Sequence, residues 1–143
     1  MIDHGQQRAA VVAEAMTWLD TPYHHHARIK GAGVDCAQLL IGVFAHAGVV
    51  PEFDPGPYAC DWHLHRSEEL FVQWLERAGA RPVQTPAPGD VAIFKFGRCF
   101  SHGSIVVTPD QVLHAYINRR VIVSSLTDAE LTGREVRFFS LWG

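Results

Sequence analysis

The chain has little of several features that would assign it to other classes of protein. Only three of its 143 residues are cysteines, an odd count that excludes a complete disulfide framework. No apolar run approaches the ~18 residues of a membrane-spanning helix, and the net charge of -3 provides no basic surface for nucleic acid. Residues 1–7 lack a basic region followed by an apolar core. We therefore expect no secretory signal, synthesis in the cytoplasm, and neither a nucleic-acid nor a membrane partner.

The composition that remains is ordinary for a globular protein. Hydrophobic residues make up 48% of the chain and charged residues 19%, both common values. A domain of this length buries roughly two-thirds of its unfolded surface, so it needs no metal or disulfide to support it. We expect residues 1–143 to form a single domain.

Hydrophobic periodicity predicts helices first and strands afterwards. Apolar residues recur at helical spacing in 6–19, 36–47 and 67–78, and prolines at 81–89 indicate a turn. Strands are then predicted at 91–96, 104–107, 112–116, 120–123 and 135–139, with a short helix at 127–131. This order predicts an α+β domain in which N-terminal helices pack on one face of an antiparallel sheet.

Cys36 stands where a thiol can become a nucleophile. It follows a glycine loop at 31–33 and precedes the apolar residues of the second predicted helix. Unpaired backbone N–H groups and the helix dipole would favour the thiolate there and lower the pKa of Cys36. A small buried hydrophobe is the alternative interpretation of a free cysteine.

Two histidines are placed to act with such a thiol. His102 opens one predicted strand, and His114 lies in the next, across a turn at Pro109. Pairing about this turn puts His114 one diagonal step from His102 on the same face of the sheet. With Cys36 they would form a Cys-His-polar triad, in which His114 fixes the tautomer of His102. Taken singly, each histidine is more simply a half-buried polar residue.

Five segments within about residues 18–116 carry a family resemblance. They are Thr21-Pro22-Tyr23, Gly33-Val34-Asp35-Cys36, Pro88-Gly89-Asp90-Val91-Ala92-Ile93-Phe94, Ser101-His102-Gly103-Ser104-Ile105-Val106 and Leu113-His114-Ala115. In this order and spacing they resemble the NlpC/P60 cysteine peptidases. The resemblance implies a papain-like core with Cys36 as nucleophile, His102 as base and His114 orienting the base.

The same resemblance implies the roles of neighbouring residues. Tyr23 would assist the backbone N–H of Cys36 at the oxyanion, and Asp35 would bind substrate. No cofactor or metal is implied. The substrate would be a peptidoglycan stem peptide, commonly cut between γ-D-glutamate and a diamino acid.

Two further segments narrow the resemblance. Tyr23–Arg28 and Asp61–Arg66 resemble the subgroup encoded with phage tail genes, which implies a virion location and other tail proteins as partners. A non-catalytic structural or assembly module of a tail tip remains an alternative. A thiol acyltransferase on a related permuted fold is a third, for which the sequence shows no acyl-chain groove.

One departure from the family concerns specificity. The family commonly continues Asp-Cys with Ser-Gly, whereas Ala37 and Gln38 follow Cys36 here. In many members that serine and the aspartate hold the free amino end of the substrate, and Ala37 cannot hydrogen-bond in this way. We expect the chain to cut peptide still attached to glycan, with recognition by residues lining a cleft, His25, Asp61, His63 and His65.

These cleft residues also raise the question of a metal. Cys60, His63 and His65 have a spacing suitable for zinc, with Asp61 or His25 as a fourth ligand. The run His24-His25-His26 does not have a spacing suitable for a metal, since neighbouring side chains on a strand point to opposite faces. A polar loop at the substrate cleft is the interpretation we prefer.

Overall fold

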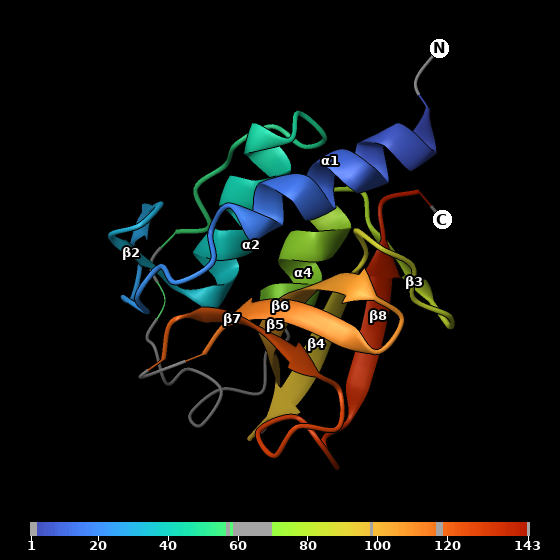
Figure 1. Ribbon diagram of the computed structural model, residues 1–143. Helices are drawn as coiled ribbons and strands as arrows, with labels where there is room; N and C mark the ends of the chain where they lie inside the picture. Colours follow the sequence, from blue (N-terminus) through green and yellow to red (C-terminus); the bar gives the residue numbers. More distant parts are fainter. Residues whose placement is uncertain (1–2, 57, 59–69, 98, 117–118, 143) are drawn as a thin grey trace.

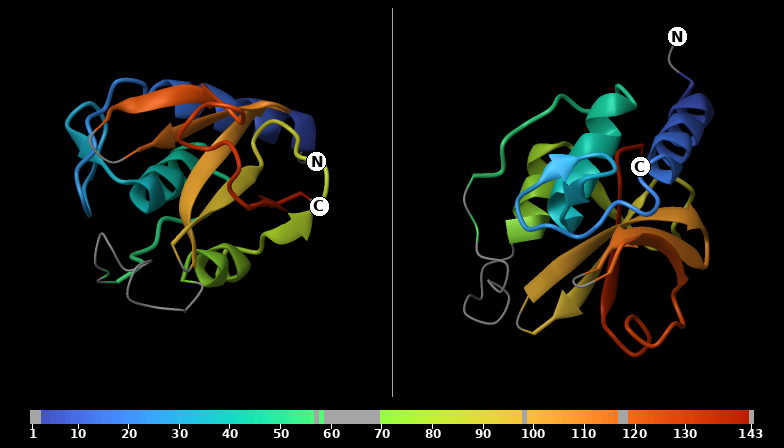
Figure 2. Two further views of the ribbon diagram at one scale, coloured as in Figure 1. Left: turned by 90° about the horizontal axis from the view of Figure 1, so that it is seen from below. Right: turned by 60° about the vertical axis from the view of Figure 1, so that its left-hand side comes forward.

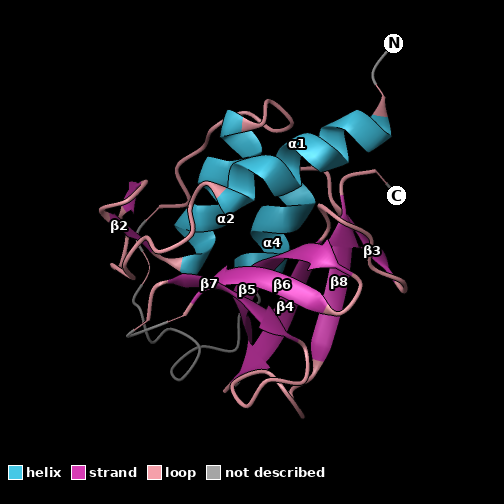
Figure 3. Ribbon diagram, in the orientation of Figure 1, coloured by secondary structure: helices cyan, strands magenta, loops and turns pink. Residues whose placement is uncertain are grey.

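The computed structural model describes residues 3–56, 58, 70–97, 99–116 and 119–142. Its helices are α1 (His4–Met16), α2 (Cys36–His46) and α4 (Leu70–Arg77). Its strands are β1 (Arg28–Ile29), β2 (Gly33–Val34), β3 (Arg81–Val83), β4 (Val91–Phe96), β5 (Cys99–Thr108), β6 (Gln111–Ala115), β7 (Val121–Ser125) and β8 (Val136–Ser140). Figure 3 shows the helices gathered in one half of the molecule and the large sheet in the other.

The large sheet has six strands in the order β3-β8-β4-β5-β6-β7. Every neighbouring pair is antiparallel. A separate hairpin of β1 and β2 lies beside α2, as the right-hand view of Figure 2 shows. The expected α+β fold, with helices packed on an antiparallel sheet, is confirmed (Figure 1).

The main core lies between the helices and the sheet. Helix α2 is apolar almost all round, and eight consecutive residues, Ala37–Phe44, are buried. Helix α4 contributes Phe71, Trp74 and Leu75, which belong to the apolar stripe expected from the sequence. The other face of the sheet carries a smaller cluster that includes Phe94 and Leu131. The sheet is therefore covered on both faces, and its central strands β4 and β5 are buried along most of their length. No described helix has both the length and the hydropathy that crossing a bilayer requires.

One local expectation was wrong, and two features were not anticipated. Residues 81–83 form strand β3, which the sequence did not predict, at the edge of the sheet, where the missing N–H of Pro82 does no harm. Residues 127–131 form turns around Asp128 instead of a helix, with Asp128 accepting a hydrogen bond from the N–H of Ser125. The hairpin of β1 and β2 was not anticipated, because two-residue strands carry no alternation that a sequence pattern can detect.

Gly103 couples the helical layer to β5, because Phe71 of α4 lies directly against its Cα. A Cβ at this position would overlap the Phe71 ring, which is 3% exposed. We expect Gly103→Ala to lower the free energy of unfolding by about 1–3 kcal/mol, the usual cost of overpacking a core. Urea unfolding measures this. In a Phe71→Leu background the same substitution should cost less, and an equal cost in both backgrounds would show that the Phe71 ring is not the cause.

Candidate active site

Asp35 fixes the start of α2 and thereby the position of Cys36. Its backbone is extended, and its Oδ1 accepts a hydrogen bond from the N–H of Gln38 at 2.8 Å, as an N-cap does. The preceding residue, Val34, is wholly buried, and its N–H donates to the carbonyl of Pro22. Cys36 is thus the first residue of a buried helix, as expected.

The Cys36 sulfur lies against the backbone of β5. The thiol donates a weak hydrogen bond to the carbonyl oxygen of Ser101, with Sγ and O 3.7 Å apart. The backbone N–H of Gly103 also lies close enough to Sγ to favour its anion. Ser101 and Gly103 are the two chain neighbours of His102, so the sulfur meets β5 at the level of His102.

The expectation of a lowered thiol pKa was wrong. Burial of the sulfur and the neighbouring Asp35 carboxylate raise the pKa of Cys36 from 9.0 to about 12. Backbone N–H groups of Gly103, Ala37 and Cys36 itself act in the opposite direction, but they do not overcome these two causes. At neutral pH the resting group is therefore a thiol, and a nearby base is needed to generate the nucleophile.

His102 and His114 meet through a buried hydrogen bond. His102 Nε2 lies 2.7 Å from His114 Nδ1, and the two residues are 7% and 0% exposed. The predicted register is present, since Ile105 pairs with Leu113 and Val106 with Val112. Because Nε2 of His102 is engaged by His114, Nδ1 is the ring nitrogen that would receive a proton from the thiol.

His114 is held in its neutral form. Burial lowers the pKa of His114 from 6.5 to about 4, with smaller effects from Glu130, Arg119 and Asp128. Its second ring nitrogen, Nε2, lies 2.8 Å from Oγ of Ser124 on β7. A neutral imidazole has one N–H, and if Nε2 donates it to Ser124, Nδ1 is an acceptor for His102.

Aromatic rings surround this histidine pair. The centroids of Phe96 and Tyr116 lie 5.0 and 5.4 Å from that of His102. Tyr116 also packs edge-on against Phe96 and His114. These apolar surfaces keep water from competing for the hydrogen bond between the histidines.

The Asp35 carboxylate is occupied by groups of the chain itself. Its Oδ2 accepts hydrogen bonds from the N–H of His26 at 2.8 Å and the hydroxyl of Tyr58 at 2.5 Å. Asp35 is 1% exposed. Burial, followed by the Asp35 charge, raises the pKa of Tyr58, so this phenol stays protonated and donates.

His25 completes the group around Asp35. Its Nε2 lies 2.9 Å from the Tyr58 carbonyl oxygen, which can only accept. Its Nδ1 lies 3.7 Å from Asp35 Oδ2, and this buried nitrogen makes no hydrogen bond with the described residues. His25 therefore supports the Tyr58 segment and stands next to Asp35.

Of the remaining candidate residues, the structure describes Tyr23 and leaves the others undescribed. Tyr23 forms a backbone bridge to Val34, two residues before Cys36. Asp61, His63 and His65 lie outside the described residues, as does Cys60. Within the described ranges no group of three His, Cys, Asp or Glu side chains could hold a metal ion.

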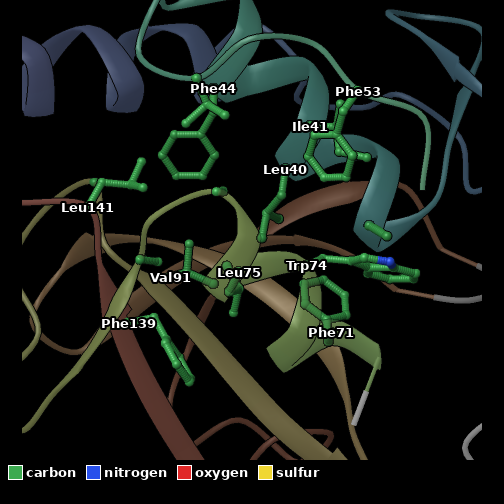
Figure 4. Close-up of a pocket in the computed structure, with 15 residues that line it drawn as sticks. Leu40, Ile41, Phe44, Phe53, Phe71, Trp74, Leu75, Val91, Phe139 and Leu141 are labelled. Carbon is green, nitrogen blue, oxygen red and sulfur yellow. The ribbon is translucent and has the colours of Figure 1, made fainter. Parts of the chain in front are cut away.

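The core also contains a pocket lined by apolar side chains (Figure 4). It has an internal volume of about 50 Å³ and lies between α2, α4 and the sheet. Leu40, Phe71 and Val91 point into it from these three sides. Its lining contains no ionisable side chain, and Ala37 is its one residue adjacent to Cys36 in the chain. We regard it as a packing gap in the core.

Comparison with known proteins identifies the fold. No family model and no curated protein matches the sequence. Among solved structures, the NlpC/p60 domain of the peptidoglycan hydrolase SagA superposes with a TM-score of 0.61 at 22% identity, covering 91% of this chain and 96% of that one. NlpC1 from Trichomonas vaginalis gives 0.68 at 14% identity, covering 97% and 45%. An NLP/P60-family protein from Staphylococcus aureus subsp. aureus Mu50, described as similar to lipoprotein, gives 0.62 at 14%, covering 95% and 42%.

This chain has the NlpC/P60 fold. At sequence identities of only 22% and 14%, these superpositions establish the architecture and no more. The chain spans less than half the length of the Trichomonas and Staphylococcus proteins, and nearly all of the SagA domain.

Two residues at the site were not anticipated from the sequence. Ser124 follows a run of β-branched residues, and only the β6–β7 register, in which His114 pairs with Ile122, places it beside His114. Tyr58 lies in a proline-rich stretch with no periodic pattern. An aromatic residue in such a stretch is the only signal the sequence offers for it.

Proposed function

We propose that this chain is a cysteine peptidase that hydrolyses peptidoglycan stem peptides, at a bond of the γ-D-glutamyl–diamino acid type. The observation that carries the proposal is the placement of the Cys36 thiol at the level of His102, which is hydrogen-bonded to buried His114. The NlpC/P60 fold, shared with a domain of a peptidoglycan hydrolase, supports the substrate class.

The raised thiol pKa determines how the reaction would begin. Nδ1 of His102 takes the Cys36 proton as the sulfur attacks the peptide carbonyl carbon, and a C–S bond forms. Backbone N–H groups at the start of α2, assisted by Tyr23, stabilise the oxyanion. The C–N bond then breaks as His102 returns the proton to the leaving nitrogen. Water, deprotonated by His102, hydrolyses the thioester and regenerates the thiol.

Identification of the products tests this function. Purified muropeptides are incubated with the protein, and the fragments are identified by mass spectrometry. We expect two fragments whose masses add up to that of the substrate plus one water, with the cut between D-glutamate and the diamino acid. Fragments cut in the glycan, or at another peptide bond, would contradict the proposed bond specificity. The Cys36→Ala variant shows whether any cleavage comes from a contaminating enzyme.

The Asp35 environment supports the proposed preference for glycan-linked peptide. Three hydrogen bonds from Gln38, His26 and Tyr58 already occupy this carboxylate. Because Asp35 is 1% exposed behind these donors, a substrate ammonium would reach it only by displacing one of them, and Ala37 offers no replacement. A hydrogen bond to a charged group contributes about 1.5–3 kcal/mol, so a free amino end would bring little advantage.

We therefore expect a stem peptide linked to a disaccharide to be cut at least as fast as the free tetrapeptide, judged by kcat/KM. In Tyr58→Phe the freed lone pair on Asp35 should shift the ratio toward the free tetrapeptide by about tenfold. The matched control is His24→Ala, which changes an exposed side chain two residues before His26, the residue whose N–H also donates to Asp35. A strong preference of the unmodified protein for the free amino end would refute this specificity.

We also propose that the protein acts as part of a phage tail, with other tail proteins as partners. The resemblance of Tyr23–Arg28 to the tail-encoded subgroup supports this. The alternative is a non-catalytic tail-tip module, in which the raised pKa of Cys36 would leave the thiol inert. Detection of the chain in purified virions tests the location, and the Cys36→Ser comparison described below separates enzyme from module.

A further inference from the structure

Ser124 is a buried polar residue that the reaction described above does not use. It lies on β7 opposite Val112 of β6, and it is 3% exposed. Its Oγ lies 2.8 Å from Nε2 of His114, on the far side of the ring from His102. The three side chains thus form one buried hydrogen-bonded series, His102–His114–Ser124.

This series has two proton arrangements with opposite consequences. In one, Nε2–H of His102 donates to Nδ1 of His114, and Nε2–H of His114 donates to Ser124. Nδ1 of His102 is then unprotonated and can accept the thiol proton. In the other, Nδ1–H of His114 donates to His102, so the proton of neutral His102 moves to Nδ1 and the base is lost.

We propose that Ser124 is a positioning residue for the reaction, acting as the acceptor that keeps the proton of His114 on Nε2. When His102 takes the Cys36 proton, both of its nitrogens carry hydrogen, and Nδ1 of His114 must then be an acceptor. The proton of His114 must at that moment be on Nε2, where burial leaves it no water. Ser124 provides the acceptor there, and an unpaired buried N–H would penalise the productive arrangement.

Two substitutions at Ser124 isolate the hydroxyl. The threonine of Ser124→Thr and the valine of Ser124→Val are both β-branched and nearly equal in volume. The two variants therefore add the same bulk to the core and differ only in that threonine keeps a hydroxyl where valine has a methyl group. We expect Ser124→Thr to keep most of the activity. Ser124→Val should lower kcat by about tenfold or more, because an incorrect tautomer next to a catalytic histidine is costly, with KM within about twofold. Urea unfolding of both variants checks that they are folded.

Nitrogen-15 NMR of the His114 ring provides a readout that does not require activity. We expect Nε2–H in the unmodified protein and in Ser124→Thr, and a shift toward Nδ1–H in Ser124→Val. The expected fall in kcat rests on the proposed function, whereas the expected tautomer of His114 does not. If the unmodified protein does not hydrolyse peptidoglycan but the His114 tautomers are as expected, the proposed function is refuted. The role of Ser124 in setting the tautomer of His114 then still stands. The same His114 tautomer in all three proteins, or equal kcat in an active Thr and Val pair, would overturn the proposal.

Discussion

Replacing His102 with alanine is expected to lower kcat by about 10²–10⁴-fold, the range for loss of a general acid–base. The raised pKa of Cys36, about 12, makes this residue depend on its base. At this pKa only about one thiol in 10⁵ is ionised at pH 7. Because His102 would take the thiol proton as the sulfur attacks, the variant should also be alkylated by iodoacetamide more slowly than the unmodified protein at neutral pH.

The control for this substitution is another histidine. His4, an exposed residue at the start of α1, can be changed to alanine without touching the site. His102→Gln keeps a polar side chain of similar size and tests whether loss of packing explains the effect. If His102→Ala retained more than about a tenth of the kcat of a folded control, His102 would not be the base. His114→Ala should reduce turnover by less than His102→Ala, as expected of an orienting residue.

Acid is expected to destabilise the fold through His114. The pKa of this residue is lowered by burial from 6.5 to about 4, so between these values the unfolded chain binds a proton that the folded chain excludes. Stability is therefore fully present above about pH 6.5 and falls as the pH drops toward 4. The loss from this group is up to about 3 kcal/mol, from 1.36 kcal/mol per pKa unit.

Urea unfolding near pH 7 and near pH 4.5, with and without His114→Gln, measures this contribution. We expect the unmodified protein to lose about 2–3 kcal/mol more than the variant over this interval, since glutamine does not titrate. Other groups that bind protons on unfolding act in both proteins and cancel in the comparison. Equal losses in the two proteins would show that His114 is protonated in the folded state or exposed to water.

The helices and the central strands could be predicted from the sequence because their signals are local. The apolar spacing of α2 placed its first residue at Cys36, where the structure has it, and the run Val91–Phe96 was placed without error. The turn at Pro109 gave the β5–β6 register and hence the proximity of His102 to His114. These features depend on periodicity and turn geometry, which neighbouring residues determine.

The features that could not be predicted depend on tertiary contacts. The helix dipole at Cys36 is a local effect, whereas the burial and the Asp35 charge that outweigh it arise from packing. Strand β3 contains Pro82, which argues against a strand except at a sheet edge, and the sequence does not reveal the strand order. Ser124 and Tyr58 reach the site through pairings and loops that no periodic pattern encodes.

The central claim is that Cys36 carries a hydrolytic reaction on peptidoglycan peptides. The most direct test is the initial rate of amino-group release from purified peptidoglycan by the unmodified protein and by Cys36→Ser, which changes one atom. The account predicts release by the unmodified protein and a rate at least about 10³-fold lower for the serine variant, because a hydroxyl is a far weaker nucleophile than a thiol in the same place. Equal rates, or no release by a folded unmodified protein, would contradict it.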